Sequence, residues 1–273
     1  MCMITYKPKD VKLDIEYLEN ALKNNFDGFG LSYHDGKELV VFTTMEFDKL
    51  KDEINKNMDK EMLIHQRKAT VGGITLENCQ PFRFKDGAYF HNGTVRSLAF
   101  EHSDKSDSYY LGDILSRVGL EDKAHVASLL GGNSKVAYMD NLGKAHILSG
   151  EWYTEGEILF SNFWYKNIVA VYGTLKQGFT NHHFLENQQF LGRGKTVDKF
   201  PMIDGALPYA FDKTGVGLNL EIELYAVDKE CLKSLDILEG VEENHYFRKE
   251  IMCKMDYKKF KAWIYSPAIK MGI

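Results

Sequence analysis

The chain lacks the features that would tie it to a membrane, a nucleic acid or an oxidising compartment. No apolar run approaches the ~20 residues that a membrane-spanning helix needs. A formal net charge of −5 leaves no basic stripe, so nucleic acid is not an expected partner. The four cysteines, Cys2, Cys79, Cys231 and Cys253, form no CxxC pair, and the N-terminus has no charged-then-apolar signal pattern. These absences favour the reducing cytoplasm.

Metal-ligand spacing is also missing. The adjacent His182-His183 and the isolated His34 and His146 have no partners at intervals typical of a metal site. We therefore expect no metal and no cofactor. What the chain does have is size: 273 residues with 44% apolar composition can fill two hydrophobic cores.

Cys2 is the most informative single residue. Removal of Met1, which is usual before a residue as small as cysteine, would leave a thiol and a free α-amine on Cys2. An α-amine titrates near ~7.7–8.0 and can take the thiol proton directly or through water. The alternative is an ordinary half-buried thiol in a first strand, in which Cys2, Ile4 and Tyr6 alternate.

Three further segments favour the catalytic interpretation of Cys2. Residues 61–70 read EMLIHQRKAT, residues 91–93 read HNG, and residues 106–108 read SDS. With Cys2, and with the DGFGLSY stretch at 27–33, they resemble the class II glutamine amidotransferases of the N-terminal-nucleophile hydrolase superfamily. The resemblance covers residues 1–164 and implies a four-layer αββα sandwich.

The resemblance also implies a site for free glutamine, which presents an α-carboxylate, an α-ammonium and a γ-amide. Arg67 would hold the carboxylate in a bidentate fork and Asp107 would pair with the ammonium, with Thr70 also in the substrate site. The Asn92 side chain and the Gly93 backbone N–H would form the oxyanion hole. Taken singly, these residues have ordinary alternatives as a surface charge, a helix cap and a hairpin turn.

Two positions depart from the family pattern. Met3 stands where the family has glycine after the nucleophile, and Gln80 stands where it has histidine before a Pro-Phe pair. We expect the Met3 side chain to crowd the approach to Cys2.

The second half begins with a strand that runs into a glycine turn. Residues 168–178 read IVAVYGTLKQG, and glycines let a backbone approach a small anionic ligand and offer N–H donors to it. Downstream, 223–228 (ELYAVD) lead into a helical stretch that ends at Leu235–Gly240, and 246–248 (YFR) open another strand. The combination resembles the γ-glutamylcyclotransferase-like family, close to the γ-glutamylamine cyclotransferases, over residues 168–268.

This second resemblance implies a reaction that one carboxylate can catalyse. The substrate's own α-amine attacks its γ-carbonyl, closing a 5-oxoproline ring and expelling an amine, so proximity is built into the substrate. Glu239 falls on the acid–base position; its alternative is a solvated carboxylate before a Gly helix cap. The implied substrate-binding positions are Tyr172, Gly173, Thr174, Leu175 and Tyr246.

The periodicity of the chain agrees with an α+β class. Strand-like runs at 29–33, 38–44, 61–69, 86–92, 135–140, 144–149 and 157–161 alternate with helix-period stretches, and helices are expected at 108–118 and 228–238. We predict an amidotransferase-like domain at 1–164 and a γ-glutamylcyclotransferase-like domain, a small mixed β-barrel with flanking helices, at 165–273.

These patterns lead to one hypothesis with two alternatives. The hypothesis is a bifunctional enzyme on γ-glutamyl amides, with Cys2-dependent hydrolysis of glutamine or a related amide and Glu239-dependent release of 5-oxoproline. A separate ATP-dependent amide ligase would then receive the ammonia, because no nucleotide-binding segment is visible. The alternatives are a protein that binds and sequesters γ-glutamyl metabolites, and a cyclotransferase whose first domain only docks.

Overall fold

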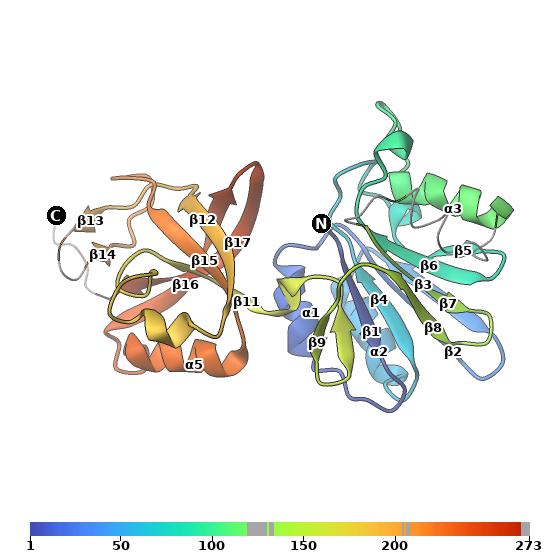
Figure 1. The fold of residues 1–273 in the computed structure, drawn as a ribbon, viewed down its shortest axis with the longest axis horizontal. Coiled ribbons are helices and arrows are strands. Elements are labelled where there is room, and N and C mark those ends of the chain that lie inside the picture. The colour runs from blue at the N-terminus through green and yellow to red at the C-terminus, as the bar shows by residue number, and fades with distance from the viewer. Residues whose placement is uncertain (119–129, 131–133, 204, 206–207, 269–273) are drawn as a thin grey trace. The chain divides into compact units, whose positions relative to one another are not determined.

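The structure is a computed structural model that describes residues 1–118, 130, 134–203, 205 and 208–268. It divides into two compact units, residues 1–165 and 166–273, which are described separately (Figure 1). Both units combine helices with strands, so the predicted α+β class is confirmed.

The first unit contains two antiparallel sheets. The larger has the strand order β3-β2-β4-β1-β10-β9, formed by β1 (Met3–Lys7), β2 (Phe29–His34), β3 (Leu39–Thr44), β4 (Met62–Gln66), β9 (Tyr153–Glu155) and β10 (Ile158–Phe160). The smaller runs β5-β6-β7-β8, formed by β5 (Phe82–Phe84), β6 (Gly87–Asn92), β7 (Lys135–Asp140) and β8 (Ala145–Ser149).

Strand alternation divides the apolar residues of the larger sheet between its two faces. Met3 packs with Leu18 of α1 (Ile15–Leu22) and Leu50 of α2 (Phe47–Lys56). The next residue, Ile4, packs with Phe90 of the smaller sheet. One face of the larger sheet is therefore covered by helices and the other by the second sheet.

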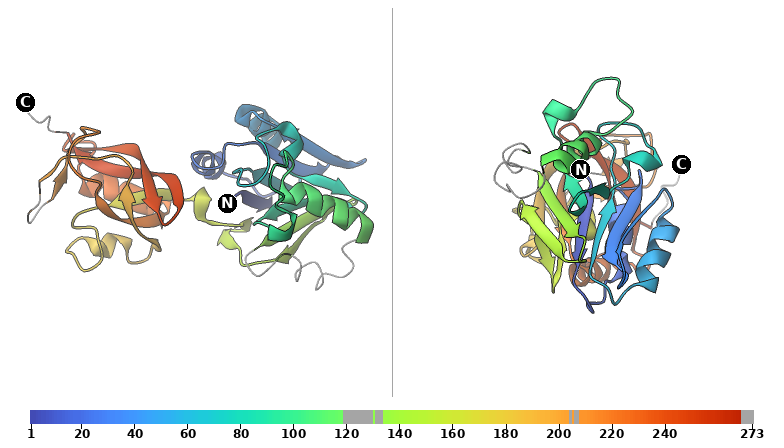
Figure 2. Two further views of the ribbon diagram at one scale, coloured as in Figure 1. Left: turned by 90° about the horizontal axis from the view of Figure 1, so that it is seen from above. Right: turned by 90° about the vertical axis from the view of Figure 1, so that its right-hand side faces the viewer.

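The outer face of the smaller sheet carries α3 (Asp107–Val118), with Leu111 and Leu115 packed against Tyr89. In Figure 2, the blue helices and the green α3 lie on opposite sides of the strands of this unit. Short 3₁₀ turns η1 (Leu76–Asn78), η2 (Arg96–Leu98) and η3 (Phe163–Tyr165) complete the described elements of this unit.

The second unit is built on a closed five-stranded barrel, as predicted. Its order is β11-β15-β12-β16-β17, formed by β11 (Asn167–Val171), β12 (Gln189–Thr196), β15 (Glu221–Val227), β16 (Tyr246–Met255) and β17 (Lys258–Pro267). The parallel pairing of β11 with β17 closes the barrel. The turn η4 (His182–Leu185) and a hairpin of β13 (Met202–Ile203) and β14 (Tyr209–Ala210) lie outside it.

One helix, α5 (Lys229–Leu238), packs on this barrel. Asp228 begins it as an N-cap, because its Oδ1 accepts a hydrogen bond of 2.8 Å from the Cys231 N–H. Leu232 and Leu235 then face the core. The helices predicted at 108–118 and 228–238 thus correspond to α3 and α5, within one residue at each end.

Two features are absent from the described residues: a membrane-spanning helix and a cluster of metal ligands. No helix among them is both long enough and apolar enough to cross a membrane. In the same part of the chain, no group of three or more His, Cys, Asp and Glu is arranged to hold a metal ion.

Candidate functional site

The glycine turn after β11 presents backbone donors that have no internal partner. The turn is fixed by hydrogen bonds from Lys176 N to Gly173 O, at 3.0 Å, and from Asn181 to both the carbonyl and the hydroxyl of Thr174, each at 3.0 Å. No described residue accepts a hydrogen bond from the N–H of Gly173, Thr174 or Leu175. Three neighbouring donors are therefore available to a ligand that carries acceptors.

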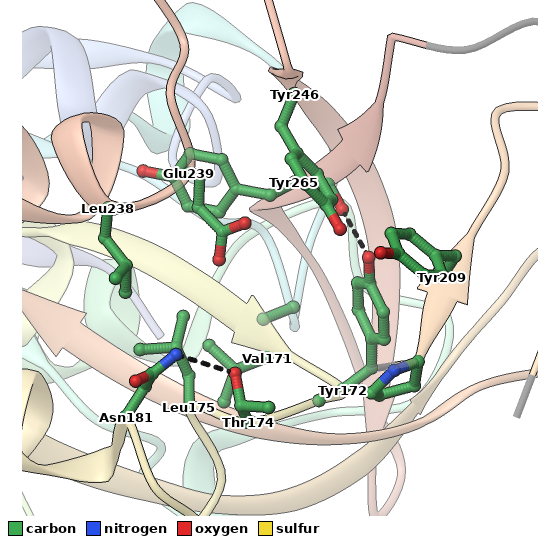
Figure 3. A pocket seen from close by; sticks show the side chains of 13 residues that line it. Val171, Tyr172, Thr174, Leu175, Asn181, Tyr209, Leu238, Glu239, Tyr246 and Tyr265 are labelled. Carbon is green, nitrogen blue, oxygen red and sulfur yellow. Dashed lines mark hydrogen bonds between the residues drawn. The ribbon is translucent and has the colours of Figure 1, made fainter. Parts of the chain in front are cut away.

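These donors border a cavity of about 240 Å³. Its walls include the predicted site residues Tyr172, Thr174, Glu239 and Tyr246 (Figure 3). Figure 3 shows the Glu239 carboxylate pointing into the cavity from the end of α5. The structure therefore brings together, in one cavity, all six site residues that the sequence indicated in this unit.

The end of α5 fixes the position of Glu239. Gly240 N donates to Ile237 O at 3.1 Å and Val241 N donates to Asp236 O at 2.9 Å, which is the hydrogen-bond pattern of a Schellman motif. Gly240 takes the left-handed conformation that this motif requires, with φ of +61°. Glu239 is the C-cap, so its side chain leaves the helix where the chain turns away.

The surroundings of Glu239 are mostly apolar and aromatic. Burial raises the pKa of its carboxyl to about 7, and no described side chain donates a hydrogen bond to it. A carboxyl group that titrates near neutrality can both take and return a proton at that pH. Burial, the nearby Glu239 carboxylate and Tyr209 together raise the pKa of Tyr246 to about 12, so Tyr246 keeps its phenolic proton.

Tyrosines from distant parts of the chain form the rest of the wall. Tyr172 O–H donates to the carbonyl of Tyr265 at 3.0 Å and accepts from Ala210 N at 3.4 Å, which ties the turn to β17 and β14. The rings of Tyr209 and Tyr246 stack with centroids 6.3 Å apart. Sequence reasoning missed Tyr209, Tyr265 and Asn181, because no motif marks them and only the folded barrel brings them to the turn.

A barrel with a buried carboxylate and free turn donors defines a small-molecule site, and comparison with known proteins identifies its class. Residues 169–270 match the family described as gamma-glutamyl cyclotransferase, AIG2-like. A putative gamma-glutamylcyclotransferase of Methanocaldococcus jannaschii is 38% identical over 107 residues, which cover 38% of this chain and 88% of that protein. The chain therefore belongs to this family through its second unit.

Further similarities concern the same unit. A putative gamma-glutamylcyclotransferase of Drosophila melanogaster is 40% identical over 105 residues, covering 36% of this chain and 67% of that protein. Among solved structures, an AIG2-like protein from Mus musculus is similar with a TM-score of 0.36 and 29% identity, over 38% of this chain and 78% of that one.

In the first unit, the sulfur of Cys2 lies against the backbone of Lys68. Sγ is 3.4 Å from Lys68 N, which donates to it, and 3.6 Å from Lys68 O. Burial raises the pKa of the Cys2 thiol, whereas the Lys68 N–H, the N-terminus and Arg67 oppose that rise. Asn162 fixes the main chain at this point by donating from Nδ2 to Cys2 O at 2.5 Å.

Two of the predicted glutamine-binding residues, Arg67 and Asp107, lie near Cys2, but hydrogen bonds within the chain already engage both. Both Arg67 and Asp107 interact electrostatically with the thiol. The Arg67 guanidinium donates to Gly73 O at 2.9 Å and Val71 O at 3.2 Å, and Asp107 accepts from Val95 N at 2.7 Å. Thr70 is exposed, and no hydrogen bond ties it to this group in the described part of the chain.

The proposed oxyanion donors lie at the end of β6. Asn92 Nδ2 lies 2.9 Å from Ser161 Oγ, while its Oδ1 is buried without a partner among the described residues. Gly93 has no room for a side chain, since a Cβ there would lie 2.4 Å from Ser134 Oγ. Asn92 is therefore part of the strand and not of a hairpin turn.

The two departures from the amidotransferase pattern have structural explanations. Met3 does not crowd Cys2, contrary to expectation, because strand alternation turns its side chain into the core with α1 and α2, where it is fully buried. Gln80 brackets the main chain of His91: its Nε2 donates to His91 O at 3.0 Å and its Oε1 accepts from His91 N at 2.6 Å. Gln80 thus fixes the strand that carries Asn92.

Proposed function

We propose that the second unit converts γ-glutamyl amides into 5-oxoproline and a free amine, the activity named for its relatives in Methanocaldococcus and Drosophila. One observation carries the proposal: a carboxyl group with a pKa of about 7 faces a cavity bordered by three unpartnered N–H donors. A γ-glutamyl head group needs both a base for its α-ammonium and donors for its oxygens.

The reaction needs two proton transfers and no enzyme nucleophile. Ionised Glu239 takes a proton from the substrate α-ammonium, and the freed amine attacks the γ-carbonyl carbon. A new C–N bond closes the ring as the amide C–N bond breaks, and Glu239 gives its proton to the leaving nitrogen. The second surplus proton passes from the ring nitrogen through Glu239 to the departing amine, so a neutral lactam and an ammonium form and Glu239 is ionised again. Because nucleophile and carbonyl share one molecule, the enzyme supplies orientation and proton transfer.

The charge of the cavity supports the assignment of the turn to the substrate carboxylate. Among the described residues that line the cavity, Glu239 is charged and none is Lys or Arg. The N–H groups of Gly173, Thr174 and Leu175 are thus the available donors for a carboxylate, in the manner of a backbone anion nest. The volume of about 240 Å³ suits a single amino-acid head group, with the amine portion extending outward.

The test is direct detection of the product. Purified protein is incubated with a panel of γ-glutamyl amines and γ-glutamyl dipeptides, and 5-oxoproline and the released amine are quantified by mass spectrometry. Stoichiometric appearance of both supports the proposal. Binding of these compounds without either product would replace it with the sequestering alternative.

We further propose that the first unit hydrolyses glutamine or a related γ-glutamyl amide at Cys2. The supporting observation is that Arg67 and Asp107 each lie close enough to interact electrostatically with Cys2, although they are 65 and 105 positions away from it in the sequence. The two sheets with helices outside them also agree with the four-layer sandwich of the class II amidotransferases. The outlying member of the set is Thr70, which we assign to the rim of this site.

The chemistry depends on removal of Met1. The Cys2 α-amine then takes the thiol proton, and the thiolate attacks the γ-carbonyl to form a tetrahedral adduct. The protonated α-amine returns the proton to the amide nitrogen, ammonia leaves as the C–N bond breaks, and the resulting thioester is hydrolysed by water to glutamate. The ammonia would pass to a separate ATP-dependent amide ligase. All four cysteines are free thiols, which fits a reducing, cytoplasmic location.

An intact-mass spectrum, combined with a glutamate assay, tests this second activity. Loss of Met1 together with glutamate release supports a working Cys2. Retention of Met1 leaves the thiol without its base and favours a docking role for this unit.

A further inference from the structure

Glu223 is a buried carboxylate that the proposed reaction does not use. It lies on β15, is only 2% exposed, and does not line the cavity. Charged side chains are almost never buried to this extent unless partners satisfy them. Its partners therefore indicate why the barrel contains it.

The carboxylate has three donors, one from the glycine turn. Oε2 accepts from the backbone N–H of Gln177 at 2.8 Å and from the Tyr225 hydroxyl at 3.1 Å. Oε1 accepts from Nε of Arg193 at 3.2 Å, although the Arg193 side chain is 74% exposed. Water screens the charge of the exposed Arg193 partner and weakens this ion pair, so the main contribution of Glu223 lies on the other oxygen.

Strand register places Glu223 directly beside the turn. It pairs with Val171, the last residue of β11, from which the chain enters the turn. Val171 is thus held by the barrel at one end of the turn, and Gln177 is held by the Glu223 carboxylate at the other. The unpartnered donors of Gly173, Thr174 and Leu175 lie between these two fixed points.

We propose that Glu223 is a positioning residue for substrate binding: it anchors the turn through Gln177 N–H so that the three free N–H groups are preorganised for the γ-glutamyl carboxylate. A hydrogen bond from a backbone N–H to a carboxylate is stronger than one to a neutral acceptor. This role rests on the proposed cyclotransferase function, because the ligand of the turn is the substrate of that reaction.

Four variants separate the anchor from the ion pair. Glu223→Leu removes both, whereas Glu223→Gln keeps an acceptor for Gln177 N–H and removes the charge. Arg193→Ala removes the ion pair alone, and Tyr225→Phe removes the second donor to Oε2 alone. The substrate is γ-glutamylmethylamide, and the readout is formation of 5-oxoproline.

We expect Glu223→Leu to raise KM by about 10- to 100-fold, the range for a lost hydrogen bond to a charged group. The pH midpoint of its kcat should match wild type, because Glu239 is untouched. Arg193→Ala and Tyr225→Phe should stay within about threefold of wild type, whereas Glu223→Gln, which offers Gln177 N–H a neutral acceptor, should fall between wild type and Glu223→Leu. Equal losses in Glu223→Gln and Glu223→Leu, or an unchanged KM in Glu223→Leu, would overturn the proposal.

Amide hydrogen exchange, resolved by residue with NMR, tests the anchor in the wild-type protein without any turnover. Gln177 should exchange slowly, while Gly173, Thr174 and Leu175 should exchange fast and gain protection when γ-glutamylmethylamide is added to the Glu239→Gln protein. Fast exchange at Gln177 would contradict the anchor even if Glu223→Leu fails to fold. Slow exchange at Gln177 in a protein that makes no 5-oxoproline would refute the cyclotransferase and leave the anchor intact.

Discussion

The two units prepare polar groups for a ligand in opposite ways. In the second unit, the turn donors of Gly173–Leu175 have no internal partner and border an open cavity. In the first unit, the groups expected to bind substrate are engaged within the chain: the Arg67 guanidinium with two carbonyls and Asp107 with a backbone N–H. The proposed site of the second unit has its turn donors unpartnered, whereas the proposed hydrolase site of the first unit would need removal of Met1 and rearranged hydrogen bonds.

The difference corresponds to the source of the nucleophile in each of the two proposed reactions. A cyclising substrate brings its own amine, so a cavity, donors and one carboxyl group suffice. A hydrolase must supply a nucleophile, and here burial raises the pKa of the Cys2 thiol and opposes its ionisation. A free α-amine on Cys2 would offset that cost by taking the thiol proton.

The largest expected effect is the loss of glutamate release in Cys2→Ala. Removal of a covalent nucleophile typically lowers kcat by roughly 10⁴- to 10⁶-fold. Formation of 5-oxoproline should be unchanged, and Cys79→Ala, which removes another thiol of the same unit, should retain glutamate release. If Cys2→Ala still releases glutamate at the wild-type rate, Cys2 is not the nucleophile and the proposed hydrolase is wrong.

The matching change in the second unit is Glu239→Gln. Loss of a positioned acid–base group should lower 5-oxoproline formation by about 10²- to 10⁴-fold, since the amide cannot take a proton from the α-ammonium. Glu243→Gln, an exposed neighbour in the same segment, is the control and should behave as wild type. Mass-spectrometric quantification of both products will show whether each variant affects one activity only; loss of both would mean that the sites are coupled.

The pH dependence separates the sites further. Glu239 must be ionised to act as a base, so kcat/KM for 5-oxoproline should fall below its pKa of about 7. The fall is tenfold per pH unit, or about 100-fold at pH 5. Glutamate release should instead follow the Cys2 α-amine, near ~7.7–8.0. A limb for 5-oxoproline near pH 4.5 would show that burial does not raise the pKa of the catalytic carboxyl.

The smallest expected effect is on stability. Burial raises the pKa of the Glu239 carboxyl to about 7 in the folded protein, whereas its ordinary value of 4.5 applies when the chain is unfolded. Between these values the folded state binds more protons, so wild-type stability falls as the pH rises through this window. Glu239→Gln removes that penalty and should be more stable than wild type at pH 8, by about 1–3 kcal/mol, with no difference at pH 4. Urea unfolding at both pH values measures this, and equal stabilities at pH 8 would argue against a desolvated carboxylate.

Most helices and strands could be predicted from local patterns of apolar residues. Apolar residues at helix and strand periods marked α3, α5 and the long strands, because each buries one face. The strand predicted at 61–69 ends earlier, at Gln66, because the backbone from Arg67 leaves the ladder to reach Gly28 and Asp27. Local sequence patterns do not indicate the residue at which a strand stops pairing with its neighbour.

The environment of the site residues was harder to predict from the sequence, because it depends on contacts between residues that are far apart in the chain. The sequence of a Glu-Gly pair after a helix does not show whether the carboxylate is solvated or buried. The tyrosines that surround the Glu239 carboxylate in the fold exclude water from it. They include Tyr209 and Tyr265, which come from a short hairpin and from the last barrel strand. The hydrogen-bond partners of Arg67 could not be predicted from the sequence either, because they are backbone carbonyls of a loop.

The left-handed glycine that ends α5 couples two neighbouring residues. A Cβ at Gly240 would lie 2.7 Å from Nδ1 of His245, and φ there is +61°. A substitution at Gly240 would therefore displace the carboxylate of Glu239 along with the turn. Glu239 and Gly240 therefore act as one structural pair, whereas Tyr209 lies on the separate β13–β14 hairpin. We expect substitutions at Tyr209 to alter the shape of the cavity without moving the Glu239 carboxylate.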